Sequence, residues 1–285
     1  MVSNQPNIES NAAAFRGLLD YAGLFPPSGL PMDQAVANVL DYQICADHEI
    51  LNTFVLPASR LQEFVAAIDL QQTETNAKLK LSVLSSAWET DVKSILDFRS
   101  EHSEIATIVS VETRQPTEAA AIRKEVDQVY VEVPPGPDVN DTIQSLQDQG
   151  AYAKIRMGGL TPDAFPSCES VAAFVIACCR HKVAFKATAG LHHALRASRQ
   201  VKSNEETFTT KMHGFVNVIA AVVRASEGES VAEVAKVLGA ENADALFPNN
   251  EVDSISLANT REHFHSIGSC SFTKPIEDLR QLGWL

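Results

Sequence analysis

The chain has 285 residues, of which 45% are hydrophobic and 21% are charged, and its formal net charge is −13 at pH 7. This length and composition are typical of a globular protein built as one α/β barrel or as two ordinary domains. The acidic balance, with no cluster of basic residues in the sequence, argues against nucleic acid and anionic membranes as partners.

No apolar run approaches the roughly 20 residues needed to cross a bilayer. The polar segment 1–13 lacks the cationic flank and apolar stretch of a secretory signal. The 5 cysteines form no CxxC pair, which predicts reduced thiols rather than disulfides or a structural zinc site. We therefore expect a cytoplasmic protein, and the sequence leaves its oligomeric state open, a homo-oligomer included.

Strand-like runs alternate with runs of helical spacing along the chain. From the second onward, their starts lie about 20 to 30 residues apart, as in repeated βα units. The strand-like runs are Gly17–Leu24, Ile50–Leu56, Leu79–Ser85, Ile105–Glu112, Val129–Val133, Tyr152–Met157 and Val183–Thr188. This order predicts one domain over residues 1–285, a (β/α)8 TIM-type barrel with parallel strands. The alternative, an open doubly wound sheet, requires a topological switch point, and no Gly-rich nucleotide loop marks one.

Two regions of the expected barrel are less regular. The eighth strand falls on either Ala243–Phe247 or Ile267–Phe272. The segment 190–242 is longer than one crossover requires, so we predict a helical insertion after strand seven. Within it, the polar loop Gln200–Thr210 is a candidate lid over the barrel mouth. Before strand seven, Ser167 is a candidate N-cap for a helix.

Side chains in a strand alternate between two faces, so charged residues two positions apart share a face. The inward face of the barrel is then expected to carry Ser110, Glu112, Tyr130, Glu132, Lys154, Arg156, Lys186 and Thr188. The charged members lie at strand ends, which converge at the mouth where such barrels place their active sites. The alternative is an ion-pair network that fills the barrel, although burying this many charges for stability alone is costly.

The stretch from Phe185 to Gly190, with Lys186 and Thr188, resembles the strand-end Lys-x-Thr/Ser-x-Gly of class I aldolases of the deoxyribose-phosphate aldolase type. This resemblance implies that Lys186 forms a Schiff base with a substrate carbonyl. A lysine desolvated in a barrel beside a second cation, Lys154, is expected to have a depressed pKa and to be a free amine near neutral pH. The alternative makes Lys186 an ion-pair partner of Glu112 or Glu132.

The strings Lys-Ile-Arg-Met-Gly-Gly and Phe-Lys-Ala-Thr-Ala-Gly-Leu-His-His are also similar to those of a bacterial protein family without an assigned activity. The similarity extends over most of the chain. It implies a barrel and leaves the reaction open.

Several residues near the expected mouth could bind an anion. Arg156 can hold a phosphate or carboxylate with two hydrogen bonds. The loop Gly158–Gly159 and the loop 268–271, which contains Ser269, allow close approach of backbone N–H groups to a ligand. Either loop could instead be a simple turn.

His192 and His193 follow Gly190 at the expected start of a helix, where backbone N–H groups favour an anion. One of them is a candidate acid or base, or, with Glu112 or Glu132, a ligand of a divalent metal. Otherwise they cap the helix or lie on the surface.

Three further residues are weaker candidates. Asp20 or Tyr21, at the end of the first strand, could position a substrate hydroxyl or relay a proton, or could be a turn cap and a packed ring. His213 either closes over the mouth or is a surface residue. Cys270 has no activating partner that the sequence marks.

Taken together, these residues predict a lyase or isomerase that acts, without a cofactor, on a small anionic carbonyl compound such as a sugar phosphate or keto acid. Lys186 would be the Schiff-base or acid/base lysine, Lys154 would lower its pKa, and Arg156 would bind the anion. Glu112 or Glu132 would move protons. The further candidates are His192 for catalysis, and Thr188, Gly158, Gly159, His193, Asp20 and Ser269 for substrate binding.

Two other functions fit the same sequence. One is a metal-dependent barrel enzyme that uses Glu112, Glu132 and one of His192 and His193 as ligands. The other is a non-catalytic barrel that binds an anionic metabolite.

Overall fold

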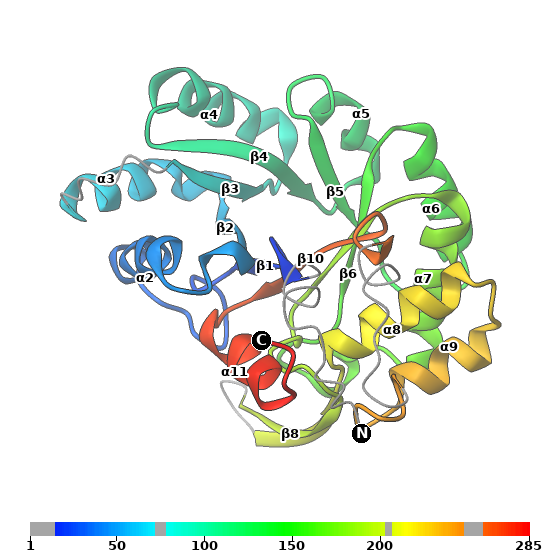
Figure 1. The fold of residues 1–285 in the computed structure, drawn as a ribbon. Helices are drawn as coiled ribbons and strands as arrows, with labels where there is room; N and C mark the ends of the chain where they lie inside the picture. Colours follow the sequence, from blue (N-terminus) through cyan, green and yellow to red (C-terminus); the bar gives the residue numbers. More distant parts are fainter. Residues whose placement is uncertain (1–14, 72–77, 203–206, 248–258) are drawn as a thin grey trace.

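The computed structural model describes residues 15–71, 78–202, 207–247 and 259–285, so the predicted polar tail 1–13 lies outside the described residues (Figure 1). In this part of the chain, parallel strands form a closed barrel in the order β1–β10–β7–β6–β5–β4–β3–β2. The barrel strands are β1 Leu19–Tyr21, β2 Leu51–Pro57, β3 Leu79–Leu84, β4 Ala106–Thr113, β5 Gln128–Glu132, β6 Tyr152–Arg156, β7 Phe185–Thr188 and β10 Phe264–Ser269. The predicted (β/α)8 barrel is confirmed.

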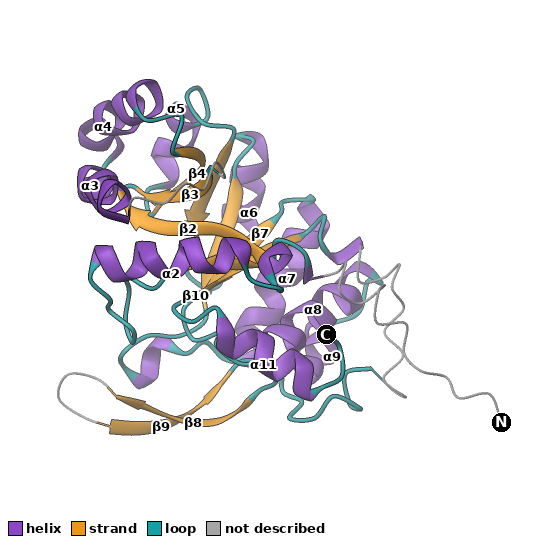
Figure 2. Cartoon of the chain, turned by 60° about the vertical axis from the view of Figure 1, so that its left-hand side comes forward, coloured by secondary structure: helices purple, strands orange, loops and turns teal. Residues whose placement is uncertain are grey.

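Each barrel strand is followed in sequence by a helix, and the helices surround the barrel (Figures 1 and 2). These helices are α2 Met32–Ile44, α3 Leu61–Gln71, α4 Trp88–Glu101, α5 Ala119–Ile122, α6 Val139–Asp148, α7 Cys168–His181, α8 Phe215–Ser226 and α11 Thr273–Gln281. As predicted, Ser167 caps α7, since its hydroxyl accepts a hydrogen bond from the backbone N–H of Ser170 at 3.2 Å. The cap satisfies one of the N–H groups that a helix start leaves without a partner.

The eighth strand is β10, which overlaps the second of the two predicted positions. It pairs with β7 on one side and β1 on the other, and so closes the barrel. The alternative, Ala243–Phe247, forms bends and turns rather than a strand. The first strand is shorter than predicted, because regular pairing covers Leu19–Tyr21 only.

The insertion after β7 begins with a β-hairpin instead of a loop. Strand β8 Ala197–Lys202 pairs antiparallel with β9 Thr207–Met212, and helices α8 and α9 Val231–Leu238 follow. The hairpin extends from one edge of the molecule (Figure 2). Phe208 contacts Phe165 of the β6–α7 loop edge-to-face, with ring centroids 6.2 Å apart. The described residues of the predicted polar loop Gln200–Thr210 are therefore strand, with 203–206 lying outside the described residues. Threonine-rich β9 has the β-branched residues that favour a strand.

The hydrophobic core lies between the barrel and its helices. Phe185 on the outer face of β7 contacts Phe174 of α7 and Phe264 of β10, with ring centroids 5.3 Å and 5.0 Å apart. All three rings are fully buried. Burial of each such side chain contributes about 1.5–3 kcal/mol to folding. This outer layer stabilises the barrel without using the barrel interior.

The inner face of the barrel is polar. Its buried side chains include Asp20, Thr53, Ser82, Ser110, Glu112, Tyr130, Lys154, Lys186 and Ser266. Barrels of this kind usually fill their interior with layers of branched apolar side chains. A polar interior has to satisfy every donor and acceptor internally, and it places ionisable groups under the mouth.

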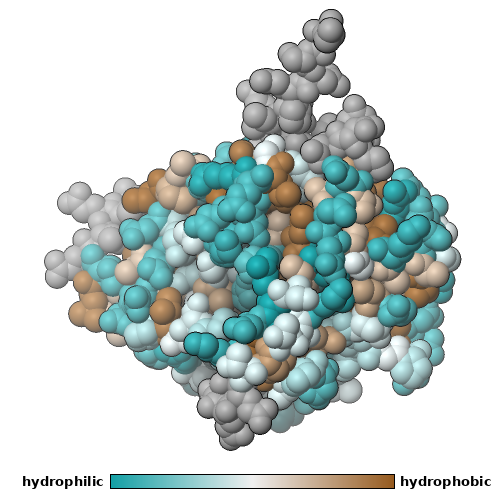
Figure 3. Space-filling view, turned by 90° about the horizontal axis from the view of Figure 1, so that it is seen from below, coloured by the Kyte–Doolittle hydropathy of each residue, from teal (hydrophilic) through white to brown (hydrophobic). Residues whose placement is uncertain are grey.

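The molecular surface shown in Figure 3 is mostly hydrophilic, with hydrophobic residues scattered among the polar ones. No helix in the described ranges is both long enough and apolar enough to span a membrane.

The loop after β7 depends on Gly190, which has φ of +72° and packs against the loop after β6. A Cβ atom there would lie 3.0 Å from the Met157 carbonyl oxygen and 3.2 Å from Gly158 Cα. Gly228 has φ of +83° but nothing within 4 Å of an added Cβ. An alanine at position 228 therefore measures the cost of the backbone conformation alone, without a steric clash.

We expect Gly228→Ala to lower the free energy of unfolding by about 1–2 kcal/mol because of its backbone conformation. Gly190→Ala should lower it by about 1–3 kcal/mol more, because the two loops must separate. Urea unfolding of both variants measures the difference. Equal losses would show that the two loops do not pack as described.

Candidate active site

Lys186 lies at the centre of the barrel interior, with its side chain 1% exposed. Its Nζ is 2.7 Å from Asp20 Oδ2 and 2.6 Å from Glu112 Oε1. The Tyr130 ring centroid lies 5.0 Å from the same nitrogen. The ammonium group is therefore shared between two buried carboxylates and the face of an aromatic ring.

Glu112 links this lysine to a second one. Its Oε2 lies 3.1 Å from Lys154 Nζ, which also lies 3.0 Å from Glu132 Oε2. Arg114, whose side chain is 72% exposed, approaches Glu132 from the surface, with its Nε 3.5 Å from Oε1. Three carboxylates and two ammonium groups thus form one chain of ion pairs across strands β1, β4, β5, β6 and β7.

Hydroxyl and amide groups complete the hydrogen bonding of the two most buried carboxylates. Ser82 donates to Glu112 Oε1 at 2.8 Å, and Ser110 donates to Ser82 at 2.7 Å. Asp20 accepts from Asn52, Thr53 and Ser266, at 2.7, 2.7 and 2.6 Å. Because these partners satisfy its oxygen atoms, Asp20 is stable inside the barrel, where it is fully buried and is not among the described residues that line the pocket at the mouth.

The charges in this network shift the ionisation of its members. Burial raises the pKa of Glu112, but the charges of Lys186 and Lys154 outweigh burial and hold it well below its usual value. Burial lowers the pKa of Lys186, but Asp20 and Glu112 outweigh it and hold it well above its usual value. The expected depressed pKa of Lys186 is therefore wrong. Two carboxylates contact its nitrogen directly, whereas Lys154 acts on it across Glu112.

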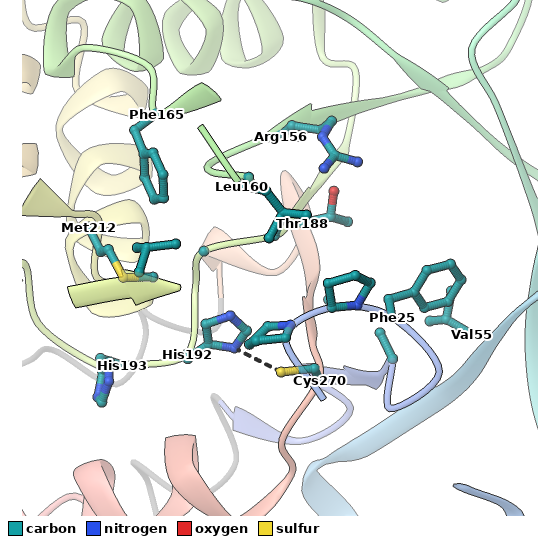
Figure 4. Close-up of a pocket in the computed structure, with 18 of the residues that line it drawn as sticks. Phe25, Val55, Arg156, Leu160, Phe165, Thr188, His192, His193, Met212 and Cys270 are labelled. Atoms are coloured by element: carbon teal, nitrogen blue, oxygen red, sulfur yellow. Dashed lines mark hydrogen bonds between the residues drawn. The ribbon is translucent and has the colours of Figure 1, made fainter. Parts of the chain in front are cut away.

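Above this network, a pocket of about 530 Å³ opens at the carboxyl ends of the strands. This volume suits a small-molecule ligand. The buried side chains of Glu112, Lys154 and Lys186 form its floor. Phe25, Val55 and Leu160 belong to its apolar walls (Figure 4). The charged side chains predicted to converge at the mouth are brought together there, except Glu132, which does not line this pocket.

The rim of the pocket is cationic. Arg156 and Thr188 project from the ends of β6 and β7 (Figure 4). Strand β8 adds Arg199 and Lys202. The floor lysines are ion-paired with carboxylates, so among the described lining residues the excess positive charge comes from Arg156, Arg199 and Lys202. In a protein with a net charge of −13, this concentration of positive charge favours an anionic ligand.

The two predicted anion-binding loops contribute unequally. Gly159 lines the pocket. Gly158 instead allows the β6 loop to pack on the β7 loop, since a Cβ there would lie 2.7 Å from the Phe165 ring and 3.1 Å from Gly190 Cα. Ser269 is also turned from the pocket, because its hydroxyl donates to the Ser271 carbonyl at 2.7 Å. Packing thus explains Gly158 and Ser269.

The adjacent histidines have different partners. His192 Nδ1 lies 3.7 Å from Cys270 Sγ and 3.2 Å from Ser269 Oγ. His193 Nδ1 lies 2.9 Å from Asp278 Oδ2 of α11. Both line the pocket. They do not start a helix as predicted, because the chain after Gly190 runs through bends into β8, so a helix N-terminus does not form an anion site there.

The alternative metal site is not assembled. Across the described ranges, no three His, Cys, Asp or Glu side chains come together as metal ligands. Both Glu112 oxygens contact lysine ammonium groups instead. The residues predicted as ligands therefore do not fit a divalent cation.

His213 and Tyr21 are structural. His213 is fully buried, lies 2.8 Å from the Pro166 carbonyl oxygen and contacts Arg196 at 3.0 Å. Burial lowers the pKa of His213 to about 4, so the ring is neutral near pH 7. Tyr21 faces outward, where its ring packs against Tyr42 and Phe54.

Two parts of the site were not predicted from the sequence. Arg199 and Lys202 were not predicted as site residues: only Lys202 lies in the predicted polar loop Gln200–Thr210, and the strand β8 that carries both to the rim was not expected. Cys270 was given no activating partner, because His192 is far from it in the sequence. The position of Cys270 just after the last barrel strand was the one feature of the sequence that could have indicated a place in the site.

No protein-family model matches the chain, and no curated protein matches it. The function is therefore argued from the pocket residues.

The buried network predicts a coupled effect on stability. Lys186→Met should lower the free energy of unfolding by about 3–5 kcal/mol, because Asp20 and Glu112 lose the cation between them. Adding Asp20→Asn to that variant should restore part of the loss, since one uncompensated carboxylate is removed. Urea unfolding of the two single variants and the double variant gives the coupling energy.

Arg60→Met is the control, because Arg60 pairs with Glu63 on the surface, and an exposed pair contributes about 0–1 kcal/mol. Strictly additive losses for Lys186→Met and Asp20→Asn would contradict the network.

Proposed function

We propose that the protein is an enzyme, a lyase or isomerase, that acts on a small anionic carbonyl compound in the pocket at the barrel mouth. The observation that carries the proposal is Lys186, a buried lysine on the floor of a pocket with a cationic rim. The likeness of residues 185–190 to the Schiff-base strand of class I aldolases points to the same chemistry. A sugar phosphate or a keto acid has the required charge and carbonyl group.

Anion binding would come from the rim. Arg156 is exposed at the pocket edge, and its planar guanidinium group can bind a carboxylate or phosphate with two parallel hydrogen bonds. Arg199 and Lys202 lie on the same rim. If the rim binds the carboxylate or phosphate of the ligand, the carbonyl group of the ligand points toward the floor.

Lys186 would supply the covalent step. A proton would pass from its ammonium group to a contacting carboxylate, and the freed amine would add to the carbonyl carbon. Loss of one water then gives an iminium ion, in which a C–N double bond has replaced the C–O double bond. The iminium carries the same positive charge as the ammonium group, so Asp20 and Glu112 would stabilise both.

The reaction class follows from the iminium ion, which draws electrons from the adjacent carbon. Either a C–C bond next to that carbon breaks, as in a lyase, or a proton is removed from it, as in an isomerase. We assign the proton movement to Glu112, because it contacts both lysines and lines the pocket, whereas Glu132 does not.

One observation favours a second candidate, an anion-binding barrel without turnover. The raised pKa of Lys186 makes it a fixed cation near neutral pH, and a fixed cation can bind an anion without any covalent step. This candidate predicts saturable binding and no covalent capture.

In either case the described cysteines are free thiols, which is compatible with the reducing cytoplasm.

Reductive trapping separates the two candidates. The protein is incubated with glyoxylate, pyruvate or glyceraldehyde 3-phosphate and cyanoborohydride, and peptide mapping locates any adduct. We expect an adduct on Lys186. Its rate of formation should rise up to about tenfold per pH unit through the neutral range, because the amine fraction grows as pH approaches the raised pKa.

The double variant Lys186→Met/Asp20→Asn is the negative control, and Arg156→Gln should slow trapping of glyoxylate more than that of neutral acetaldehyde. Adducts confined to exposed lysines such as Lys93, combined with saturable binding of the anions, would support the non-catalytic candidate instead.

A further inference from the structure

Cys270 and His192 form a second polar pair in the same pocket, separate from the lysine floor. Cys270 follows directly after β10, and His192 lies in the loop after β7; these strands are neighbours in the barrel. The sulfur lies 3.7 Å from His192 Nδ1, and both side chains line the pocket (Figure 4). The residue is 9% exposed, so a ligand in the pocket could reach a thiol that bulk solvent barely contacts.

The neighbouring hydroxyl determines where the His192 proton lies. Ser269 has one hydroxyl proton, and it is donated to the Ser271 carbonyl at 2.7 Å. The 3.2 Å contact between Ser269 Oγ and His192 Nδ1 therefore requires the proton to be on the nitrogen. The Cys270 sulfur faces the same N–H group at 3.7 Å, so it accepts a hydrogen bond that it shares with Ser269 Oγ, a role that suits a thiolate better than a thiol.

The charges around Cys270 favour the thiolate. Burial raises its pKa, but the hydrogen bond and charge of His192, together with hydrogen bonding to Ser28, outweigh burial, so the pKa lies below its usual value. Burial, and to a smaller extent the charge of Cys270, raises the pKa of Tyr21 on β1, so this neighbouring phenol is neutral near pH 7. Across the pocket lie the basic side chains of the floor and rim.

The other described cysteines lack this environment. Burial raises the pKa of Cys168, Cys178 and Cys179. None of them, nor Cys45, lines the pocket at the barrel mouth, as far as the described residues define it. The chain therefore carries its own comparison thiols.

We propose that Cys270, with His192 as its proton partner, is a second reactive centre of the pocket that adds to the carbonyl carbon of small anionic aldehydes or 2-oxo acids. The reactive form is the Cys270 thiolate beside a protonated His192 imidazolium. The sulfur forms a bond to that carbon, the carbonyl π electrons move to the oxygen, and the oxygen takes one proton from the imidazolium, which becomes a neutral imidazole. The product is a reversible hemithioacetal or hemithioketal, and no oxidant or reductant is consumed. This centre rests on the proposed function only for the class of substrate, a small anionic carbonyl compound. It does not require Lys186.

Alkylation with peptide mapping tests the reactivity of the thiol. At pH 7, iodoacetamide should modify Cys270 about tenfold faster than Cys168 or Cys179. Iodoacetate, which carries a carboxylate, should favour Cys270 over Cys45 more than iodoacetamide does, because the rim is cationic. His192→Gln should slow alkylation of Cys270 at pH 7 and move its pH midpoint upward, whereas His193→Gln should leave that midpoint unchanged.

Carbon NMR with glyoxylate labelled at its aldehyde carbon tests the covalent step. A protein-bound hemithioacetal resonance is expected in the wild type and in Lys186→Arg, and its loss is expected in Cys270→Ser. If the hemithioacetal resonance persists in Lys186→Arg, and reductive trapping gives no adduct on Lys186 of the wild type, the Schiff base is refuted and the thiol centre is retained. The thiol proposal is overturned if Cys270 reacts no faster than Cys168, or if glyoxylate binds without giving this resonance.

Discussion

The contact on which this structure depends is the sharing of Lys186 between Asp20 and Glu112 inside a closed barrel. An isolated charge in this position would be costly, so each member of the network requires its partners. Lys154 and Glu132 extend the balance of charge toward the surface. The apolar core outside the barrel stabilises the fold, which leaves the interior available for polar groups.

This arrangement has a chemical consequence. A lysine held by two carboxylates is a stable ammonium ion, and the same surroundings would stabilise an iminium ion of equal charge. The energetic cost falls on the step that joins the ammonium ion to the iminium ion, because the ammonium group must lose a proton before its nitrogen can attack the carbonyl carbon. The pocket adds a thiol–imidazole pair on its wall, so a lysine nitrogen and a cysteine sulfur both face one pocket.

The regular repeat of strand-like and helical runs was sufficient to predict the barrel, and the side-chain period of two was sufficient to predict the inward direction of Glu112, Lys154 and Lys186. It could not predict which oxygen meets which nitrogen, because Asp20 reaches Lys186 only when the last strand closes the barrel between β1 and β7. The sign of the Lys186 pKa shift was therefore wrong. The hairpin β8–β9 was missed because its alternation is mostly polar, without the apolar face that marks a core strand. His192 and Cys270 meet only through strand order.

The most direct test of this account is the titration of Lys186 itself, followed by NMR of the Nζ and Cε nuclei in protein labelled at lysine, with Lys186→Arg to assign the resonance. The account predicts that Lys186 stays protonated beyond its ordinary value of 10.5, with a midpoint above those of the exposed lysines. A midpoint below them, with a free amine near neutral pH, would contradict the shared ion pair with Asp20 and Glu112.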